Sequence, residues 1–351
     1  MRKVLSAMLV TAMLTSVLSG CGGASSAAAS STASSAAAPA AAPASSESAS
    51  TDEVFEFKLA ENQPADNPIS KGMQKFAELA KEKSGGTINI EVYLDAQLGS
   101  ENETIDQVQA GTLDFARINT SALSSTADEV GVFTLPYIFT STEHKYKVLD
   151  GEIGQGVIDS LEKYNMIGLG YWEAGSRNFY STKKPIKGVA DMKGLKVRVQ
   201  QSDVAIKMVE LLGAAATPMS YGEVYQGLQT GVIDAAENDF VSYYTSGHYE
   251  VAKNFTLDGH MAPPAMLLMS KTSWDKLSDN QKAAITEAAL EACTWQRKAM
   301  NDYQDEARKK VEEAGCEIFE VDAKEFQNSV PSIYEMYPQY ASIIEAIQKE
   351  A

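Results

Sequence analysis

The stretch Met192-Lys-Gly-Leu-Lys-Val-Arg-Val-Gln-Gln-Ser202 contains a turn, a strand and the start of a helix in close succession. Its apolar residues occupy every second position from Leu195 to Val199, an alternation that predicts a half-buried strand. Ser202 and Asp203 follow and offer an N-cap for a helix over residues 204–212. This order of elements is typical of an α/β protein.

Arg198 lies on the polar side of this predicted strand, near its carboxyl end. The start of a helix beside the carboxyl end of a strand is where open α/β sheets bind anionic ligands. Taken alone, however, the stretch favours a solvated arginine on an edge strand, because arginines are mostly exposed. The remainder of the sequence has to decide between these two interpretations.

The N-terminus has the composition of an export signal. Arg2 and Lys3 precede an apolar run over residues 4–18, which is short for a bilayer span and typical of a secretory signal peptide. The following Leu18-Ser19-Gly20-Cys21 resembles the lipobox of bacterial lipoproteins, which implies cleavage after residue 20 and lipid on Cys21. We therefore expect an extracytoplasmic protein anchored to the outer face of the cell membrane. The alternative is an ordinary signal peptide that is cleaved further along the chain.

Residues 21–53 are dominated by Ala, Ser, Gly, Pro and Thr and predict a disordered tether. The folded domain is expected over residues 54–351. Removing Arg2 and Lys3 with the signal peptide takes the formal charge from −17 to −19, which argues against nucleic-acid binding.

Two cysteines lie in the predicted folded domain. Cys293 falls within a predicted helix and Cys316 just after it, too far apart to pair locally. Buried free thiols are expected, with a disulfide as the alternative.

Strands and helices alternate along the first half of the domain. Strands are predicted over residues 54–60, 88–93 and 112–118, and helices over residues 69–83 and 101–110. This alternation predicts βαβ units and a mainly parallel sheet flanked by helices.

One unit occurs twice. Gln109–Ala116 and Gln229–Ala236 each contain a helix end, a glycine and a short apolar strand with one aspartate. Ser100 caps the first predicted helix, and Ser220 with Glu223 predicts a capping box for the second. The repeat indicates two similar lobes, with Asn119 and Asn238 leaving equivalent strand ends and facing each other across a cleft.

The lobe boundaries follow from the predicted crossings between the lobes. We expect lobe I over residues 54–174 with part of residues 263–351, and lobe II over residues 175–262. From Ser278 the helical spacing continues for about 35 residues, or roughly 50 Å of helix. Such a helix is longer than one lobe is wide.

Enzyme motifs are absent from the sequence. It contains no Gly-x-Ser-x-Gly, His-Glu-x-x-His, Walker-type loop or Cys-x-x-Cys, and we predict no enzyme activity, cofactor or metal. Of the three histidines, His144 and His248 lie among polar residues and are expected to be solvated, whereas His260 is a candidate to line a cleft.

The remaining polar residues suit the binding of an organic anion. Arg177 and Arg198 lie in or just after predicted strands, and two guanidinium groups can grip one carboxylate. Aromatic side chains could offer flat surfaces to the ligand, with core packing as their alternative role: Trp172, Tyr137 and Tyr171. Polar side chains could hydrogen-bond its hydroxyl groups, with turns or helix caps as their alternative role: Asn62, Glu101, Asn119 and Asn238.

Five ordered motifs carry a resemblance to a known family over residues 55–334. They are Gln97-Leu-Gly with Val108–Asp114, Leu135–Phe139, Gly170–Arg177, Met192–Arg198 and Gln229–Asn238. With these motifs the chain resembles the solute-binding proteins of TRAP (tripartite ATP-independent periplasmic) transporters, DctP-like family. The resemblance implies a two-lobe, periplasmic-binding-protein-like fold that closes over a small organic acid, with a long helix across both lobes.

The resemblance also implies roles for individual residues. Arg198 falls on the carboxylate-clamping arginine, Arg177 on a second arginine and Asn238 on the asparagine that faces the carboxylate. The first-lobe contacts fall on Asn62, Glu101 and Asn119. Residues 237–248 are most similar to members that bind hexuronates such as glucuronate or galacturonate. The implied partners are a small organic acid and integral membrane permease subunits, and we expect a monomer.

Three alternatives stay open. The ligand could be a C4-dicarboxylate or another organic acid. The chain could be a surface enzyme acting on acidic sugars, with Glu101 and His260 as acid and base. Binding could also serve sensing through a receptor kinase in place of transport.

Overall fold

The computed structural model describes residues 52–351. The predicted signal peptide, Cys21 and the predicted tether up to residue 51 lie outside the described residues. The carbonyl oxygen of Glu53, just before the first strand, accepts a hydrogen bond from Gln281 Nε2 (2.8 Å). No helix within residues 52–351 combines the length and the apolar character that crossing a bilayer requires.

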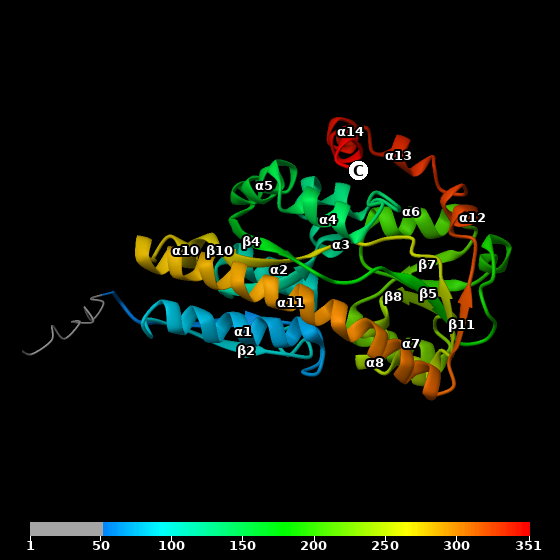
Figure 1. The fold of residues 1–351 in the computed structure, drawn as a ribbon, viewed down its shortest axis with the longest axis horizontal. Coiled ribbons are helices and arrows are strands. Elements are labelled where there is room, and N and C mark those ends of the chain that lie inside the picture. Colours follow the sequence, from blue (N-terminus) through cyan, green and yellow to red (C-terminus); the bar gives the residue numbers. More distant parts are fainter. Residues whose placement is uncertain (1–51) are drawn as a thin grey trace, which may run out of the picture. The chain divides into compact units, whose positions relative to one another are not determined.

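The first of two sheets has five strands in the order β2-β1-β3-β10-β4 (Figure 1). β1 runs parallel to β2 and β3, whereas β10 runs antiparallel to β3 and β4, so the sheet is mixed. The strands of this sheet are β1 (Phe55–Ala60), β2 (Ile88–Tyr93), β3 (Phe115–Asn119), β4 (Met166–Trp172) and β10 (Ala265–Ser270). The connecting helices α1 (Pro68–Lys83) and α2 (Glu101–Ala110) match the predicted helical periodicity.

The second sheet has six strands in the order β11-β9-β5-β8-β6-β7. Here β5 is antiparallel to both of its neighbours, and the other pairs are parallel. Its strands are β5 (Asn178–Ser181), β6 (Lys196–Val199), β7 (Ala215–Pro218), β8 (Ala235–Asn238), β9 (Asn254–Leu257) and β11 (Glu317–Glu320). β6 carries Arg198 and lies between β8 and β7, so the interpretation of Arg198 as an exposed edge-strand residue is wrong.

The chain crosses between the sheets three times, through residues 173–177, through residues 258–264 and through residues 271–316, which connect β10 to β11. The long helix α11 (Asp279–Glu313) has the predicted 35 residues and begins with a capping box formed by Ser278 and Gln281. It contacts α1 beside the first sheet and α8 (Phe240–Thr245) beside the second (Figure 1). The predicted two-lobe α/β fold with a long helix is therefore confirmed.

The first crossing is fixed to α11 by one side chain. The amide of the fully buried Gln296 accepts a hydrogen bond from Glu173 N (3.0 Å) and donates one to Glu173 O (2.9 Å). Glu173 also accepts a hydrogen bond from Lys145 Nζ (2.7 Å), and these contacts satisfy a charged residue that is itself buried.

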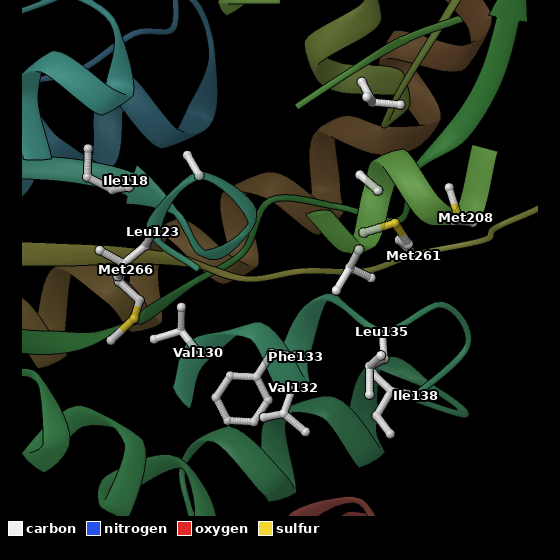
Figure 2. Close-up of a cluster of buried hydrophobic side chains, with 14 of the residues drawn as sticks. Ile118, Leu123, Val130, Val132, Phe133, Leu135, Ile138, Met208, Met261 and Met266 are labelled. Carbon is white, nitrogen blue, oxygen red and sulfur yellow. The ribbon is translucent and has the colours of Figure 1, made fainter. Parts of the chain in front are cut away.

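A large apolar cluster joins elements that flank both sheets. Figure 2 shows Ile118 of β3 and Met266 of β10 in the same cluster as Met208 of α6 (Asp203–Leu211) and Met261 of the second crossing. Its aliphatic and aromatic side chains are withdrawn from solvent, which favours the folded state by about 25 cal/mol per Å² buried.

Two predicted helix caps are absent. Ser202 occupies the N-cap position of α6, but its hydroxyl makes no hydrogen bond. The capping box at Ser220 does not form, because residues 221–223 fold into a 3-10 turn in which Glu223 N donates to Ser220 O (3.2 Å). The Ser100 cap is present, as a capping box with Glu103.

The C-terminal region contains two short helices, α12 (Ala323–Gln327) and α13 (Ile333–Met336). Pro331 lies between them and lacks the N–H that a helix interior requires. The remaining elements are α3 (Thr120–Leu123), α4 (Thr142–Leu149), α5 (Glu152–Asp159), α7 (Val224–Thr230), α9 (His248–Val251), α10 (Lys271–Trp274) and α14 (Ala341–Lys349), with 3-10 helices at Asp128–Thr134, Ser160–Tyr164, Val189–Met192, Tyr221–Glu223 and Pro338–Tyr340.

Both cysteines of the domain are buried free thiols. Cys293 packs in the cluster beneath α1, and Cys316 packs in a separate cluster beside the second sheet. The Cys293 thiol donates to the carbonyl oxygen of Tyr171 (2.9 Å), and burial raises its pKa to about 11. Both residues therefore have a packing role.

Candidate functional site

A small pocket lies where strand ends of both sheets meet, and we name it the interlobe pocket. Its volume is about 20 Å³, which is room for little more than one water molecule. The residues that line it come from both lobes and from α11, and most of them are polar: Asn62, Gln63, Asn67, Ile69, Glu101, Arg117, Asn119, Ala174, Arg177, Gln200, Tyr221, Asn238, Ser242 and Met300.

The first-lobe half of the interlobe pocket is built around Arg117. The register of β1 and β3 pairs Ala60 with Ala116, which places Glu61, the residue after β1, beside Arg117 in the middle of β3. Arg117 Nε donates to Glu61 Oε2 (2.7 Å), and its NH2 donates to Glu61 Oε1. Arg117 NH1 also reaches Oε1 of Glu101 (3.4 Å). The guanidinium charge is therefore matched within the first lobe.

The second-lobe half is built around Glu237 on β8. Arg177 donates to both carboxylate oxygens of Glu237, and its NH1 donates to Asn238 Oδ1 (2.9 Å). Although burial opposes it, the charge of Arg177 lowers the pKa of Glu237 to about 2. Glu237 is therefore ionised at neutral pH and fully engaged by Arg177.

Arg198 has weaker compensation. Its side chain is 3% exposed, and its hydrogen bonds from Nε (3.1 Å) and NH2 (2.8 Å) both go to the carbonyl oxygen of Met219. The nearest carboxylate atom given by the structure is Glu237 Oε1, 3.9 Å from Arg198 NH1, and Arg177 already uses that carboxylate. Burial and then the charge of Arg177 lower the pKa of Arg198. Arg177, Arg198 and Glu237 together carry two positive charges and one negative charge, so the charge of Arg198 is left without a carboxylate of its own.

Arg198 adjoins the interlobe pocket through Tyr221. Its guanidinium carbon is 5.8 Å from the centroid of the Tyr221 ring, which is part of the pocket wall. The Tyr221 hydroxyl is hydrogen-bonded with Ser246 Oγ (2.6 Å). A carboxylate that reached Arg198 would give this buried guanidinium the matching charge that Glu237, at 3.9 Å and already paired with Arg177, supplies only weakly.

The structure brings most of the predicted site residues together. Arg177, Asn238, Asn62, Glu101 and Asn119 all line the interlobe pocket, and the two asparagines that end equivalent strands, Asn119 and Asn238, share it. Asn119 Oδ1 also caps α3 by accepting from Ser121 N (3.3 Å).

Trp172 and Tyr137, two of the three predicted aromatic contacts, lie elsewhere, and the third, Tyr171, is buried on β4 and is not among the residues that line the interlobe pocket. Trp172 is 1% exposed and belongs to the apolar cluster beneath α1, where its ring lies against Gly72. Tyr137 lines two other hollows, and its hydroxyl donates to Asp258 O (3.3 Å). Neither is among the residues that line the interlobe pocket, and a contact with ligand stays a prediction for both.

The expectation that His144 and His248 are solvated is wrong, because both are buried. His144 Nε2 lies 2.9 Å from the carbonyl oxygen of Ile347, and His248 Nδ1 lies 2.8 Å from the hydroxyl of Tyr180. Burial and then the nearby Arg198 lower the pKa of His248 to about 3, so this ring is neutral at neutral pH. The residues next to each histidine in the sequence are polar, and they carry no information about the distant segments that bury these rings in the fold.

His260 is buried behind the second-lobe half of the pocket. Its ring stacks on Phe179 (4.2 Å between centroids), its Nδ1 lies 2.7 Å from Asp258 Oδ2, and it is not among the residues that line the pocket. The structure therefore does not bring His260 and Glu101 to one pocket, as an acid–base pair would require.

Sequence reasoning missed Arg117, Glu61, Glu237 and Tyr221. The signal was present for the first two, since Glu61 and Arg117 lie at the carboxyl ends of two predicted strands. What was lacking was the pairing of those strands, which are separated by more than 50 residues and become neighbours only in the sheet.

A larger hollow of about 660 Å³ lies along the outer edge of β4, between α5 and α11. Its lining is mainly apolar and acidic, and its one arginine, Arg297, is paired with Asp150 (2.6 Å). It has no unmatched cation for an organic anion. Among residues 52–351, no three His, Cys, Asp or Glu side chains are arranged to hold a metal ion.

Comparisons with known proteins agree with this architecture. The sequence profile of the bacterial extracellular solute-binding proteins, family 7 (DctP), matches residues 59–342. A solute-binding protein of Chromohalobacter salexigens is 39% identical over 290 residues, which cover 81% of this chain and 86% of the relative.

Two solved structures share the fold throughout. A TRAP periplasmic solute-binding protein from Xanthobacter autotrophicus, with bound β-D-galacturonate, has a TM-score of 0.81 and 38% identity, covering 84% of this chain and 99% of its own. A second, from Chromohalobacter salexigens with bound D-glucuronate, has a TM-score of 0.81 and 38% identity, covering 84% of this chain and 100% of its own.

Proposed function

The chain belongs to family 7 of the bacterial extracellular solute-binding proteins, and on that premise we propose that it binds a hexuronate such as D-glucuronate or D-galacturonate. The single observation that carries this proposal is Arg198, a buried guanidinium without a carboxylate of its own beside a pocket shared by two lobes. The solved relatives with bound galacturonate and glucuronate support the choice of ligand class.

The ligand carboxylate is proposed to bind Arg198 and Asn238, with Arg177 fixing Glu237 and Asn238 in place. A carboxylate at this point restores the charge balance of the second-lobe half. Asn62, Glu101 and Asn119 then face the hydroxyl groups of the sugar from the first lobe. The ligand contacts both lobes and so favours their closure.

Ligand entry requires the interlobe pocket to widen, because a pocket of about 20 Å³ cannot hold a sugar acid. We propose that residues 175–262, together with β11, which pairs with β9, form a lobe that moves against the remainder of the domain about the three crossings. One hydrogen bond across the mouth, from Asn67 Nδ2 on the first lobe to Thr245 Oγ1 on α8 (3.2 Å), would break on opening.

Delivery to integral membrane permease subunits completes the proposed role. We further propose that lipid on Cys21 anchors the protein to the outer face of the cell membrane and that residues 21–53 serve as a tether, on the basis of the sequence Leu18-Ser19-Gly20-Cys21. Metabolic labelling with a fatty-acid analogue should mark the wild-type protein and not Cys21→Ala. Equal labelling of both would contradict the anchor.

Calorimetric titration tests the ligand. D-glucuronate and D-galacturonate should bind, whereas D-glucose, which has the hydroxyls without the carboxylate, should not. Recovery of unaltered uronate after hours of incubation would separate binding from an enzyme activity on acidic sugars. Binding of malate or succinate with no response to either uronate would contradict the proposed ligand class.

A further inference from the structure

The first-lobe half of the interlobe pocket contains an arginine with a different environment from that of Arg198. Arg117 is 3% exposed and is the central residue of β3. Its Nε and NH2 hold the two carboxylate oxygens of Glu61, its NH2 also donates to Asn62 Oδ1, and its NH1 points to Glu101. All three nitrogens of the guanidinium are therefore engaged by the protein.

The charge of Arg117 is matched within this group. Although burial opposes it, the carboxylate of Glu61 raises the pKa of Arg117, whereas the pKa of Arg198 is lowered. The bidentate pair with Glu61 leaves no positive charge for an incoming anion. With Glu101 added, the three side chains carry two carboxylates and one guanidinium. This half of the pocket is therefore acidic, while the Arg198 half is basic.

Glu101 is the carboxylate that faces the pocket. Its side chain is 12% exposed, against 0% for that of Glu61. The hydrogen bonds from Asn119 N (2.7 Å) and Arg117 NH1 (3.4 Å) both use Glu101 Oε1 and leave Oε2 out, and Glu101 lines the interlobe pocket. A hydroxyl group can donate to such an oxygen. A second carboxylate cannot, and it would meet a like charge in a site with little water.

We propose that Arg117, held by Glu61, is a positioning residue that presents Glu101 and Asn62 as hydroxyl acceptors, so that the first-lobe half selects against ligands with a second carboxylate. This inference rests on the proposed function. It deepens that function by assigning the two halves of the pocket to the two ends of the ligand: the carboxylate to Arg198, and the hydroxyls to the Arg117 group. Specificity then includes a repulsive element as well as an attractive one.

The test compares D-glucuronate with D-glucarate, a six-carbon sugar acid with a carboxylate at both ends. Calorimetry on the wild-type protein should give at least about 100-fold weaker binding of glucarate, because like charges set side by side at an interface cost several kcal/mol. Glu101→Gln keeps the shape of the side chain and removes its charge. It should reduce the preference for glucuronate over glucarate, measured as the ratio of their Kd values, about tenfold or more. Asp106→Asn, an exposed change on the same helix, removes one negative charge away from the pocket and should leave the ratio unchanged.

A second variant keeps the test decisive if Glu101→Gln loses glucuronate binding or fails to fold. Glu61→Gln withdraws the carboxylate that matches Arg117, so the first lobe gains an unmatched cation and glucarate should gain affinity relative to glucuronate. An unchanged glucarate-to-glucuronate ratio in the variant that retains binding would overturn the inference and leave the proposed function standing. Absence of uronate binding in the wild-type protein would overturn the proposed function, and this inference with it.

Discussion

The free energy of unfolding should fall strongly when Arg177 is replaced by methionine and change little when Arg198 is, although each arginine is 3% exposed. Arg177→Met leaves the buried carboxylate of Glu237 without its bidentate partner. Removing one member of a buried ion pair costs about 3–5 kcal/mol. This variant should therefore be strongly destabilised in the absence of ligand.

Arg198→Met removes two hydrogen bonds to one carbonyl oxygen, that of Met219. Leaving that carbonyl unpaired costs about 1–3 kcal/mol. The same change removes a buried guanidinium whose desolvation costs several kcal/mol and is only weakly compensated by Glu237 at 3.9 Å. The two effects nearly cancel, so the free energy of unfolding should change by less than about 1 kcal/mol.

Urea denaturation of both variants, without and with D-glucuronate, measures these differences. At a ligand concentration 100 times Kd, the wild-type protein should gain about 2.7 kcal/mol, and Arg198→Met should gain nothing. A destabilisation of Arg198→Met by 3 kcal/mol or more, equal to that of Arg177→Met, would refute the reasoning. Such a result would mean that the Arg198 guanidinium is already compensated by the protein and stabilises the fold in the absence of ligand.

Three further changes test single contacts. Gln296→Ala removes both hydrogen bonds to Glu173 at the first crossing and should lower the free energy of unfolding by about 2–3 kcal/mol, measured by denaturation; a loss below about 0.5 kcal/mol would contradict that role. Thr245→Val removes the acceptor for Asn67 across the pocket mouth and should weaken uronate binding about fivefold by calorimetry, whereas unchanged affinity would show that the contact does not favour closure. Although burial opposes it, Asp258 raises the pKa of His260 to about 9, above its unfolded value of about 6.5. The resulting stabilisation, about 3 kcal/mol, is complete below pH 6.5 and is lost as the pH rises to 9. The difference in free energy of unfolding between the wild type and His260→Gln should therefore shrink over that range. A difference that stays constant with pH would show that protonation of His260 does not stabilise the fold.

Local signals in the sequence were sufficient for the elements and for the long helix. The alternation around Arg198 and the capping box at Ser278 depend on neighbouring residues, and both predicted elements are present. The antiparallel placement of β5 and β10 could not be predicted in this way, because strand order depends on contacts between distant segments. The same reason explains why the stretch around Arg198, taken alone, favoured an edge strand, since a strand's place at the edge or in the interior of a sheet is a property of the whole fold.

The candidate site was predictable only in part. Arg177, Asn238 and the first-lobe polar residues converge on one pocket, as expected for residues at the ends of strands in two facing sheets. The carboxylates that pair with each arginine in the folded protein could not be inferred from the sequence. Whether Arg117 or Arg198 is available to a ligand depends on which carboxylates the folded chain places beside each, and the register of β1 and β3 decides this for Arg117.

A crystal structure of the protein with D-glucuronate would test the central claim most directly. We expect the lobes to close on the sugar acid with its carboxylate at hydrogen-bonding distance, about 2.7–3.2 Å, from the guanidinium of Arg198, and with its hydroxyls toward Glu101 and Asn62. A uronate whose carboxylate faces Arg117, or which binds outside the interlobe pocket, would contradict it.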